Sequence, residues 1–377
     1  MSIMPILRFS ARYILLPLLL VVIGAALATY LLLEVGRDVN ANMEWYGSPN
    51  GILEEDFVEL GGHPQYVRIR GRDRNNPVLL DLHGGPGGAQ SGMTHRGFRP
   101  LTDYFTVVEW DQRGAGRSIG DESLIPTMTY ERMVADTVEL IEHLQQRLGI
   151  EQVILVGHSW GSMLGIGVIQ ERPDLITAYV GVGQALVWTL AFEETKRLIL
   201  GAAREAGDTG VIASLEALPQ KWPDASEHEA YMEHIKTIQG PLARYGAGLH
   251  AANDTNVLRS DLFIDAVFSP VTDLGDIISM LSPNTVTMAL IEDLQHRDFR
   301  EQLGNEYQVP MFIFQGEHDW QTPTTLVKPW FAELKAPHKE YIAFENSAHM
   351  VFNEESGKFL VELVNRVRPF ALGEDSQ

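Results

Sequence analysis

The sequence predicts an α/β fold in which a mostly parallel sheet is covered by helices on both faces. Three short apolar runs, PVLLDL, FTVVEW and QVILVG, each end in a loop rich in glycine. A stretch with apolar positions at helical spacing, MTYERMVADTVELIEHLQQRLGI, lies between the second and third runs. Because chemistry in parallel sheets collects at the carboxyl ends of the strands, we expect all three loops to meet at one edge.

The core is predicted to be interrupted by one insertion. Residues 51–187 form its first part, which opens with a β-hairpin around Gly61 and Gly62. Residues 188–305 read as helices and loops without strand patterns, and this length exceeds that of an ordinary loop, so we expect an inserted helical cap. Strand patterns resume in YQVPMFIFQG and HKEYIAFEN, and residues 306–377 complete the core with a last helix, SGKFLVELVNRVRPF.

The N-terminal segment is apolar enough to cross a membrane. Tyr13–Leu33 is a run of 21 residues without a charged side chain, and a helix of that length spans the hydrocarbon core of roughly 30 Å. Arg8 and Arg12 precede the run, so residues 1–12 are expected in the cytoplasm and the bulk of the chain outside. Residues 34–50 are polar and turn-rich, which is typical of a linker.

A cleavable signal peptide and a buried core helix are the alternative interpretations of this segment, and its length and terminal position disfavour the core helix. Ala26-Leu27-Ala28 resembles a cleavage site, and cleavage there gives a secreted protein that begins near Thr29. The apolar run continues past that site, which favours an uncleaved anchor.

Composition excludes several classes of function. The chain has 29 basic and 50 acidic residues and a formal charge of −21, which argues against nucleic-acid binding because phosphate contacts need clustered Lys and Arg. It has no cysteine, so disulfides, thiolate metal sites and a cysteine nucleophile are ruled out. HExxH is missing, and we expect neither a metal nor a cofactor. The sequence leaves the oligomeric state open.

GHSWG matches the pattern G-x-S-x-G, with Gly157, Ser159 and Gly161. That pattern needs a sharp turn between a strand and a helix, where side chains on the flanking residues would collide. QVILV before it is a strand pattern and SMLGIGVIQERP after it a helix pattern, so we interpret Ser159 as a nucleophile. The alternative is an ordinary strand–helix turn that carries a surface serine.

A serine nucleophile needs a base and an acid that orients the base. Asp319 follows the strand pattern VPMFIF and is the expected acid, with Glu317 as a nearby competitor. His349 lies in the loop after the strand pattern EYIAF and is the expected base, whereas His338 precedes that strand and belongs at the opposite edge. The chain order of serine, acid and histidine is that of the α/β-hydrolase fold.

An oxyanion hole needs two N–H donors near the serine. The N–H of Trp160, directly after the nucleophile, is the first candidate, and the N–H of Gly85 in HGGPGG is the second. A phosphate-binding loop is the alternative for HGGPGG, but GxxxxGK[ST] and GxGxxG are missing. His83 is expected to form structural hydrogen bonds beneath the hole.

HGGPGG, DQRGAGRS, GHSWGS, GEHD and SAHM together resemble the proline iminopeptidase group of α/β-hydrolases. The resemblance covers roughly residues 51–185 and 306–370. It implies a serine peptidase with the triad Ser159, Asp319 and His349 and the oxyanion hole Gly85 and Trp160. It also implies structural roles for Asp111, Arg113 and Arg117 in the DQRGAGRS loop.

The sequence departs from this family pattern at two places. Many relatives have cysteine where this chain has Ala115, a change without a chemical consequence. Family aminopeptidases bind the free amine of the substrate with cap carboxylates, one of them in a segment F-P-E-x-W, and here Gln220 replaces that glutamate in LPQKW. Glu193 or Glu194 is the candidate substitute, although both also read as solvated helix residues.

Three functions follow from these patterns. The first, which the resemblance favours, is a serine hydrolase with an acyl-enzyme mechanism, an aminopeptidase of proline iminopeptidase type that releases N-terminal residues from short peptides. The second is a membrane-anchored esterase or lipase-like hydrolase with the same triad. The third is a catalytically inactive hydrolase fold that acts as a binding protein.

Overall fold

A computed structural model describes residues 4–43, 49–92, 97–219, 222–246, 248–250, 264–272 and 285–374. Its centre is one eight-stranded sheet in the order β1-β2-β4-β3-β5-β6-β7-β8. The strands are β1 Ile52–Leu60, β2 His63–Gly71, β3 Val78–Leu82, β4 Thr106–Trp110, β5 Val153–His158, β6 Ile176–Val182, β7 Met311–Gly316 and β8 Lys339–Phe344. The expected hairpin between β1 and β2 turns at Gly61 and Gly62. The other six strands, β3 to β8, are parallel to one another.

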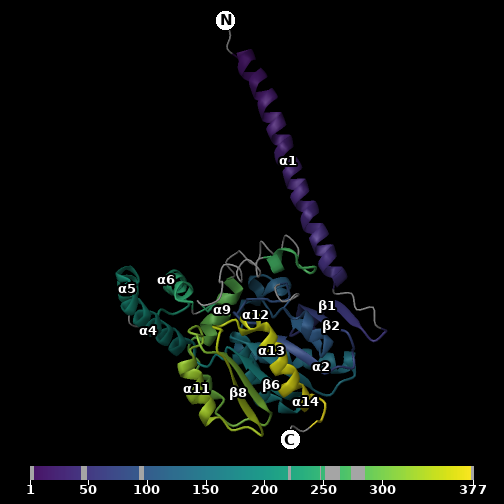
Figure 1. Cartoon of the computed structure of the whole chain (residues 1–377), viewed down its shortest axis with the longest axis vertical. Coiled ribbons are helices and arrows are strands. Elements are labelled where there is room, and N and C mark those ends of the chain that lie inside the picture. Colours follow the sequence, from purple (N-terminus) through teal and green to yellow (C-terminus); the bar gives the residue numbers. More distant parts are fainter. Residues whose placement is uncertain are drawn as a thin grey trace.

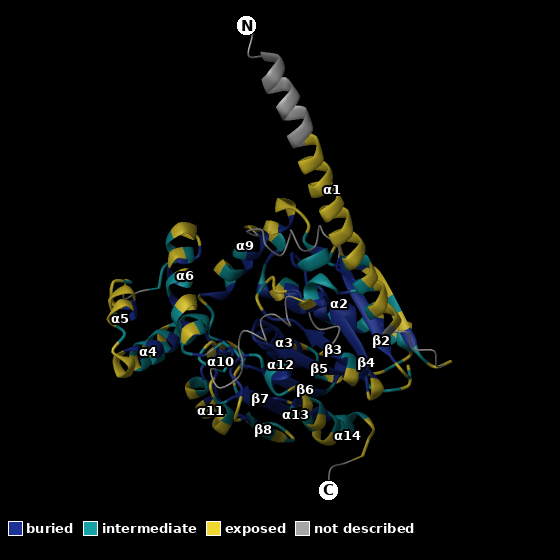
Figure 2. Cartoon of the chain, turned by 45° about the horizontal axis from the view of Figure 1, so that its top comes forward, coloured by how far each residue is buried: buried dark blue, intermediate teal, exposed yellow. Residues whose placement is uncertain are grey.

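Helices cover both faces of the sheet, as predicted (Figure 2). Leu79 and Leu80 are neighbours in β3, and they belong to different apolar clusters because successive side chains of a strand point to opposite faces. One face is covered by α2 Tyr130–Leu148, α3 Trp160–Glu171 and α11 Thr324–Glu333. The other is covered by the 3-10 helix Arg99–Asp103, α12 Val351–Glu354 and α13 Ser356–Glu362.

The final helix is interrupted, although the sequence pattern predicts one continuous helix. After α13 the chain forms a π-helical turn over Leu363–Val367 and ends in α14 Arg368–Ala371. Pro369 lies in the first turn of α14, and proline has no N–H to continue the ladder of a preceding helix.

The strand order reverses at β3, where the chain places β4 on one side and β5 on the other. Ligands of open α/β sheets bind at such a switch point, outside the carboxyl ends of the strands. The loops after β3 and β5 are HGGPGG and GHSWG, so the two glycine-rich motifs meet where the topology opens a crevice.

An inserted helical region separates β6 from β7, as the sequence predicts. Its helices are α4 Trp188–Ala206, α5 Thr209–Glu216, α6 His228–Arg244, α9 Thr285–Leu294 and α10 Phe299–Gln302. Helices α4, α5 and α6 share a small apolar core of their own and stand to one side of the sheet (Figure 1). Helices α9 and α10 are separate because Asp298 caps the start of α10, where its carboxylate accepts from the Arg300 N–H.

Helix α1 spans Met4–Met43 and projects away from the sheet and the cap (Figure 1). Among the described residues, Leu16–Asn42 is the one helical stretch whose length and composition fit a membrane span, and a signal sequence fits the same criteria. The helix continues through residues 34–43, which the sequence pattern suggests as a turn-rich linker. Glu34 and Arg37 form an ion pair one turn apart, which supports this continuation.

The last turns of α1 also contact the cap insertion. The Arg37 Nε–H donates to the Val267 carbonyl at 3.3 Å, and the Asn40 side-chain amide donates to the Phe268 carbonyl at 2.7 Å. Gly36 faces the Phe268 ring so closely that a Cβ there would overlap it. The end of α1 therefore packs against the cap insertion.

Candidate active site

Ser159 lies on a strained turn between β5 and α3. Its backbone has φ 53° and ψ −118°, and it is the one non-glycine residue with positive φ in the described part of the chain. A Cβ on Gly161 would collide with the Leu82 carbonyl, and one on Gly157 with the Gly161 carbonyl. The flanking glycines therefore allow a turn that raises the serine above the sheet, and such stored strain is typical of functional sites.

Asp319 and His349 form a direct pair at the ends of β7 and β8. His349 Nδ1 lies 2.8 Å from Asp319 Oδ2, and both side chains are almost fully buried. A carboxylate only accepts hydrogen bonds, so Nδ1 carries the proton and Nε2 presents a lone pair. No described residue hydrogen-bonds to this buried Nε2, which leaves it available to receive a proton.

Glu317 and His338, the two competing residues, have other partners. Glu317 forms an ion pair with Lys328 at 2.7 Å. His338 pairs with Glu340 at 2.8 Å near the start of β8, at the opposite edge of the sheet.

Asp319 is fixed by groups that sequence patterns did not reveal. Its Oδ1 accepts from the N–H groups of Gln321 and Thr322 at 2.8 and 2.9 Å. Its Oδ2 accepts from the Thr322 hydroxyl at 2.7 Å and from the Gln315 amide at 3.0 Å. The loop QGEHDWQTP is thus wound around the carboxylate, and its polar residues were the only sequence signal for these contacts.

Thr322 connects this pair to the serine. Its hydroxyl lies 3.3 Å from His349 Nδ1, and it lines the same cavity as Ser159 and Gly85. The cavity is therefore lined by the expected serine and one expected oxyanion residue, and Thr322 links it to the Asp319–His349 pair.

The loop after β3 brings its backbone against the serine. Gly85 has φ +121°, which side chains rarely tolerate, and a Cβ on Gly84 would lie 3.3 Å from the Ser159 Cβ. Trp160 is the first residue of α3, so its N–H has no partner within the helix and lies at the positive end of the helix dipole. Both groups are suited to stabilise an oxyanion beside Ser159.

His83 and Gln112 support this loop from below. His83 Nδ1 donates to the Gly84 carbonyl at 2.8 Å, and Nε2 accepts from the Gln112 N–H at 3.1 Å. The Gln112 side chain in turn accepts from the Trp160 indole at 2.8 Å. Burial lowers the pKa of His83 from 6.5 to about 4, so its ring is neutral. These contacts fit the structural role expected for His83.

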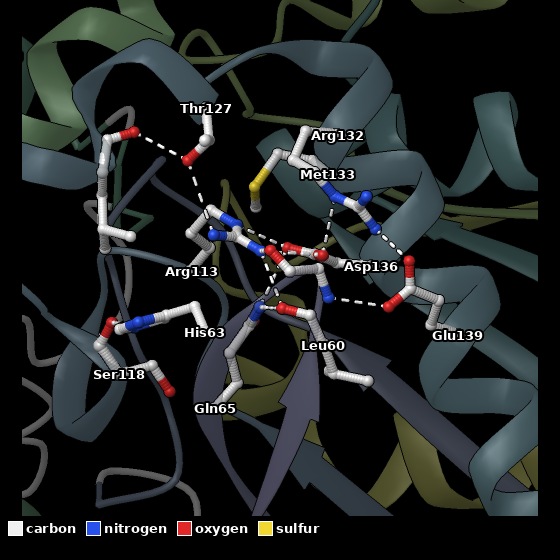
Figure 3. Close-up of polar contacts among 12 residues, drawn as sticks. Leu60, His63, Gln65, Arg113, Ser118, Thr127, Arg132, Met133, Asp136 and Glu139 are labelled. Atoms are coloured by element: carbon white, nitrogen blue, oxygen red, sulfur yellow. Dashed lines mark hydrogen bonds and ion pairs between the residues drawn. The ribbon is translucent and has the colours of Figure 1, made fainter.

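The charged residues of DQRGAGRS tie their loop to neighbouring elements. Arg113 is buried and forms a two-pronged pair with Asp136 of α2, at 2.7 and 3.0 Å, while donating to the Leu60 carbonyl (Figure 3). Asp111 accepts from the Arg117 N–H, and the Arg117 guanidinium lies over the Tyr66 ring. This arrangement matches the structural roles that the family resemblance implies.

The cavity beside Ser159 has a volume of about 220 Å³ and is mainly apolar. Helices α4 and α6 provide most of its wall, and its polar side chains are uncharged. No carboxylate lines it among the described residues. The apolar lining residues include Met163, Val187, Trp188, Phe192, Ile235, Ile238 and Leu242.

Glu193 and Glu194, two of the three residues proposed to bind a free amine, do not line this cavity. Glu194 bonds to Arg197 and to the Thr325 hydroxyl. Glu193 is exposed and lines a separate hollow of the cap with Trp222 and His234. Gln220 lies outside the described residues.

Comparisons with known proteins agree with this fold and group. Residues 77–206 match the family model described as alpha/beta hydrolase fold. The chain is 28% identical to a probable aminopeptidase of Bacillus subtilis (strain 168), over 84% of this chain and 96% of that protein. It is 36% identical to a proline iminopeptidase of Arabidopsis thaliana, over 38% of this chain and 34% of that protein. A proline iminopeptidase-related protein from Thermus thermophilus has a similar structure, with a TM-score of 0.60, 19% identity, and coverage of 85% and 98%.

Proposed function

This chain is an α/β-hydrolase that resembles the proline iminopeptidase group, and we propose that it acts as a serine hydrolase through an acyl-enzyme. The observation that carries the proposal is the Asp319–His349 pair, whose buried Nε2 is free of partners among the described residues, beside a serine on a strained elbow. The complete set of catalytic parts argues against an inactive binding protein.

The proposed reaction follows from these positions. Ser159 Oγ attacks the substrate carbonyl carbon while its proton passes to His349 Nε2. The N–H groups of Gly85 and Trp160 stabilise the oxyanion. His349 then protonates the leaving group, and Asp319 stabilises the imidazolium throughout. Water attacks the acyl-enzyme with His349 as base, which releases the acid and regenerates Ser159.

We propose that the enzyme is an aminopeptidase. Its substrate is a short peptide whose N-terminal residue has an uncharged, apolar side chain. A relative that matches over 96% of its length is named a probable aminopeptidase, and the apolar cavity suits an apolar side chain. An ester substrate is the second candidate, because the cavity lacks a carboxylate for an ammonium group among its described residues.

A substrate panel separates these candidates. Purified full-length protein in mild detergent is offered prolyl, alanyl and leucyl p-nitroanilides and p-nitrophenyl esters, with Ser159→Ala as control. Cleavage of an amide that Ser159→Ala abolishes supports the aminopeptidase. Cleavage of esters alone identifies an esterase. Absence of labelling by a fluorophosphonate probe contradicts the serine hydrolase itself.

We further propose a single-pass membrane enzyme with residues 1–12 in the cytoplasm and the catalytic domain outside, anchored by residues 13–33. In this arrangement residues 51–187 and 306–377 form the core, and residues 188–305 the cap. The charge asymmetry around the apolar run supports this orientation. N-terminal sequencing of the membrane-extracted protein tests whether this anchor is retained, since a start near Thr29 would identify a cleaved signal peptide.

A further inference from the structure

His158, the residue before Ser159, contacts the loop after β3 and the loop after β8. It is 5% exposed and is the last residue of β5. Its Nε2 lies 3.2 Å from the His349 carbonyl oxygen, and its Nδ1 lies 3.3 Å from the Gln90 amide nitrogen in the loop after β3. Its ring centre lies 4.7 Å from that of His349.

These contacts fix the protonation of the His158 ring. A carbonyl oxygen only accepts, so Nε2 carries the proton and donates to His349, while Nδ1 accepts from Gln90. Burial and the neighbouring rings of His349 and His83 hold the pKa of His158 well below its ordinary value. The ring is therefore neutral and does not repel an imidazolium formed on His349.

The contact with His349 is directed at its main chain. The side chain of His349 is held by Asp319. The backbone N–H of His349 donates to the Gly248 carbonyl at 3.3 Å. His158 holds the remaining polar group, the carbonyl. A catalytic group needs its orientation fixed closely, because a misplacement of about 1 Å costs about 100-fold in rate.

We propose that His158 is a positioning residue, which orients His349 through the Nε2–H hydrogen bond to the His349 carbonyl and links it to the loop that carries Gly85. This inference rests on the proposed serine hydrolase function. Nothing in the G-x-S-x-G pattern assigns this role, since the pattern leaves that position free.

Two amide variants of the full-length protein isolate this hydrogen bond. Glutamine extends far enough to place its amide nitrogen near the position of Nε2, whereas asparagine reaches only the position of Nδ1. For His158→Asn we expect kcat to fall about 100-fold with KM unchanged within about twofold, on whichever ester or amide the wild type cleaves. For His158→Gln we expect kcat within about threefold of wild type. The rate of fluorophosphonate labelling of Ser159 should likewise be near that of wild type in His158→Gln and much lower in His158→Asn.

Thermal unfolding of each variant separates positioning from general destabilisation. The proposal holds if the two variants unfold at similar temperatures and only asparagine loses kcat. It is overturned if both keep wild-type kcat, if both lose it equally, or if the loss follows the unfolding temperature or appears in KM. A wild type that neither labels nor turns over overturns the proposed function instead. Equal labelling of wild type and His158→Asn overturns this inference alone.

Discussion

At the scale of single residues, the proposed chemistry depends on a carboxylate that is hydrogen-bonded from several sides. Asp319 accepts hydrogen bonds from Gln321, Thr322 and Gln315 in addition to the one from His349. These groups keep the carboxylate in one orientation, which fixes the tautomer of His349. The nearby Glu317 lies in the same loop but pairs with Lys328, so the two acids have different environments.

The first prediction compares these two acids. Asp319→Asn presents an amide N–H in place of an acceptor, which favours the wrong tautomer of His349, and we expect kcat to fall by about 10⁴. Glu317→Gln is the matched control and should leave kcat within about twofold, because its ion pair is partly exposed. Turnover of the preferred chromogenic substrate measures both. A larger loss in Glu317→Gln than in Asp319→Asn would reverse the assignment of the acid.

At the scale of elements, two contacts hold distant segments together. The loop after β4 is joined to α2 by Arg113 and Asp136, and the end of α1 is joined to residues 264–272 by Arg37 and Asn40. The first contact is a buried ion pair. At the second, the backbone of Gly36 lies close against the Phe268 ring. Each can be disturbed by one substitution with a matched control.

The second prediction concerns the buried ion pair. Arg113→Met leaves Asp136 with fewer partners in the interior, and we expect a loss of about 3 to 5 kcal/mol in the free energy of unfolding. Arg172→Met removes partly exposed pairs with Asp174 and Glu142 and should cost at most about 1 kcal/mol. Urea denaturation of both variants gives the comparison. Equal stability of the two variants would contradict a stabilising role for the Arg113 pair.

The third prediction concerns the contact between α1 and the cap. Gly36→Leu places a side chain against the Phe268 ring, and we expect overpacking to cost about 1 to 3 kcal/mol of stability. Gly24→Leu, in the same helix, meets no other atom within 4 Å and should be tolerated. The thermal unfolding midpoint in detergent measures both. If the two substitutions lower it equally, the contact does not stabilise the enzyme body.

At the scale of the whole molecule, the buried histidines His83 and His158 make stability depend on pH. His83 is neutral in the folded protein because burial lowers its pKa to about 4, whereas in the unfolded chain the value is near 6.5. Between these values the unfolded state binds the proton more readily, so stability rises with pH and is lost as pH falls from about 6.5 towards about 4. His158, whose pKa is also lowered, contributes with the same sign. Burial and Glu109 raise the pKa of Asp81, which contributes with the opposite sign.

The fourth prediction isolates His83 from these other groups. We expect the wild type to lose about 2 kcal/mol more stability between about pH 7.5 and pH 5 than His83→Gln, because the variant has no imidazole to protonate. The contribution of Asp81 is common to both proteins and cancels in the difference. Urea denaturation at the two pH values measures it. Parallel losses in both proteins would show that His83 does not cause the acid sensitivity.

Local sequence patterns predicted the sheet, the cap and the positions of the candidate triad. The apolar runs specify strands because their period and length are local properties, and the strand–loop–helix context of GHSWG specifies the elbow for the same reason. The patterns missed the helical extension over residues 34–43, the breaks at Asp298 and Pro369, and the supporting roles of Gln112, Gln315 and Thr322. Each of these depends on partners or caps that periodicity does not record.

By itself the sequence determined the fold class and the order of serine, acid and histidine, since both follow from short patterns along the chain. Only the tertiary structure decided which groups surround them. His158 and His349 are 191 residues apart, and their hydrogen bond exists because β5 and the loop after β8 end at the same edge of the sheet. The apolar wall of the cavity likewise arises where α4 and α6 meet the core. The physical reason is that contacts between distant segments depend on topology, which no local pattern encodes.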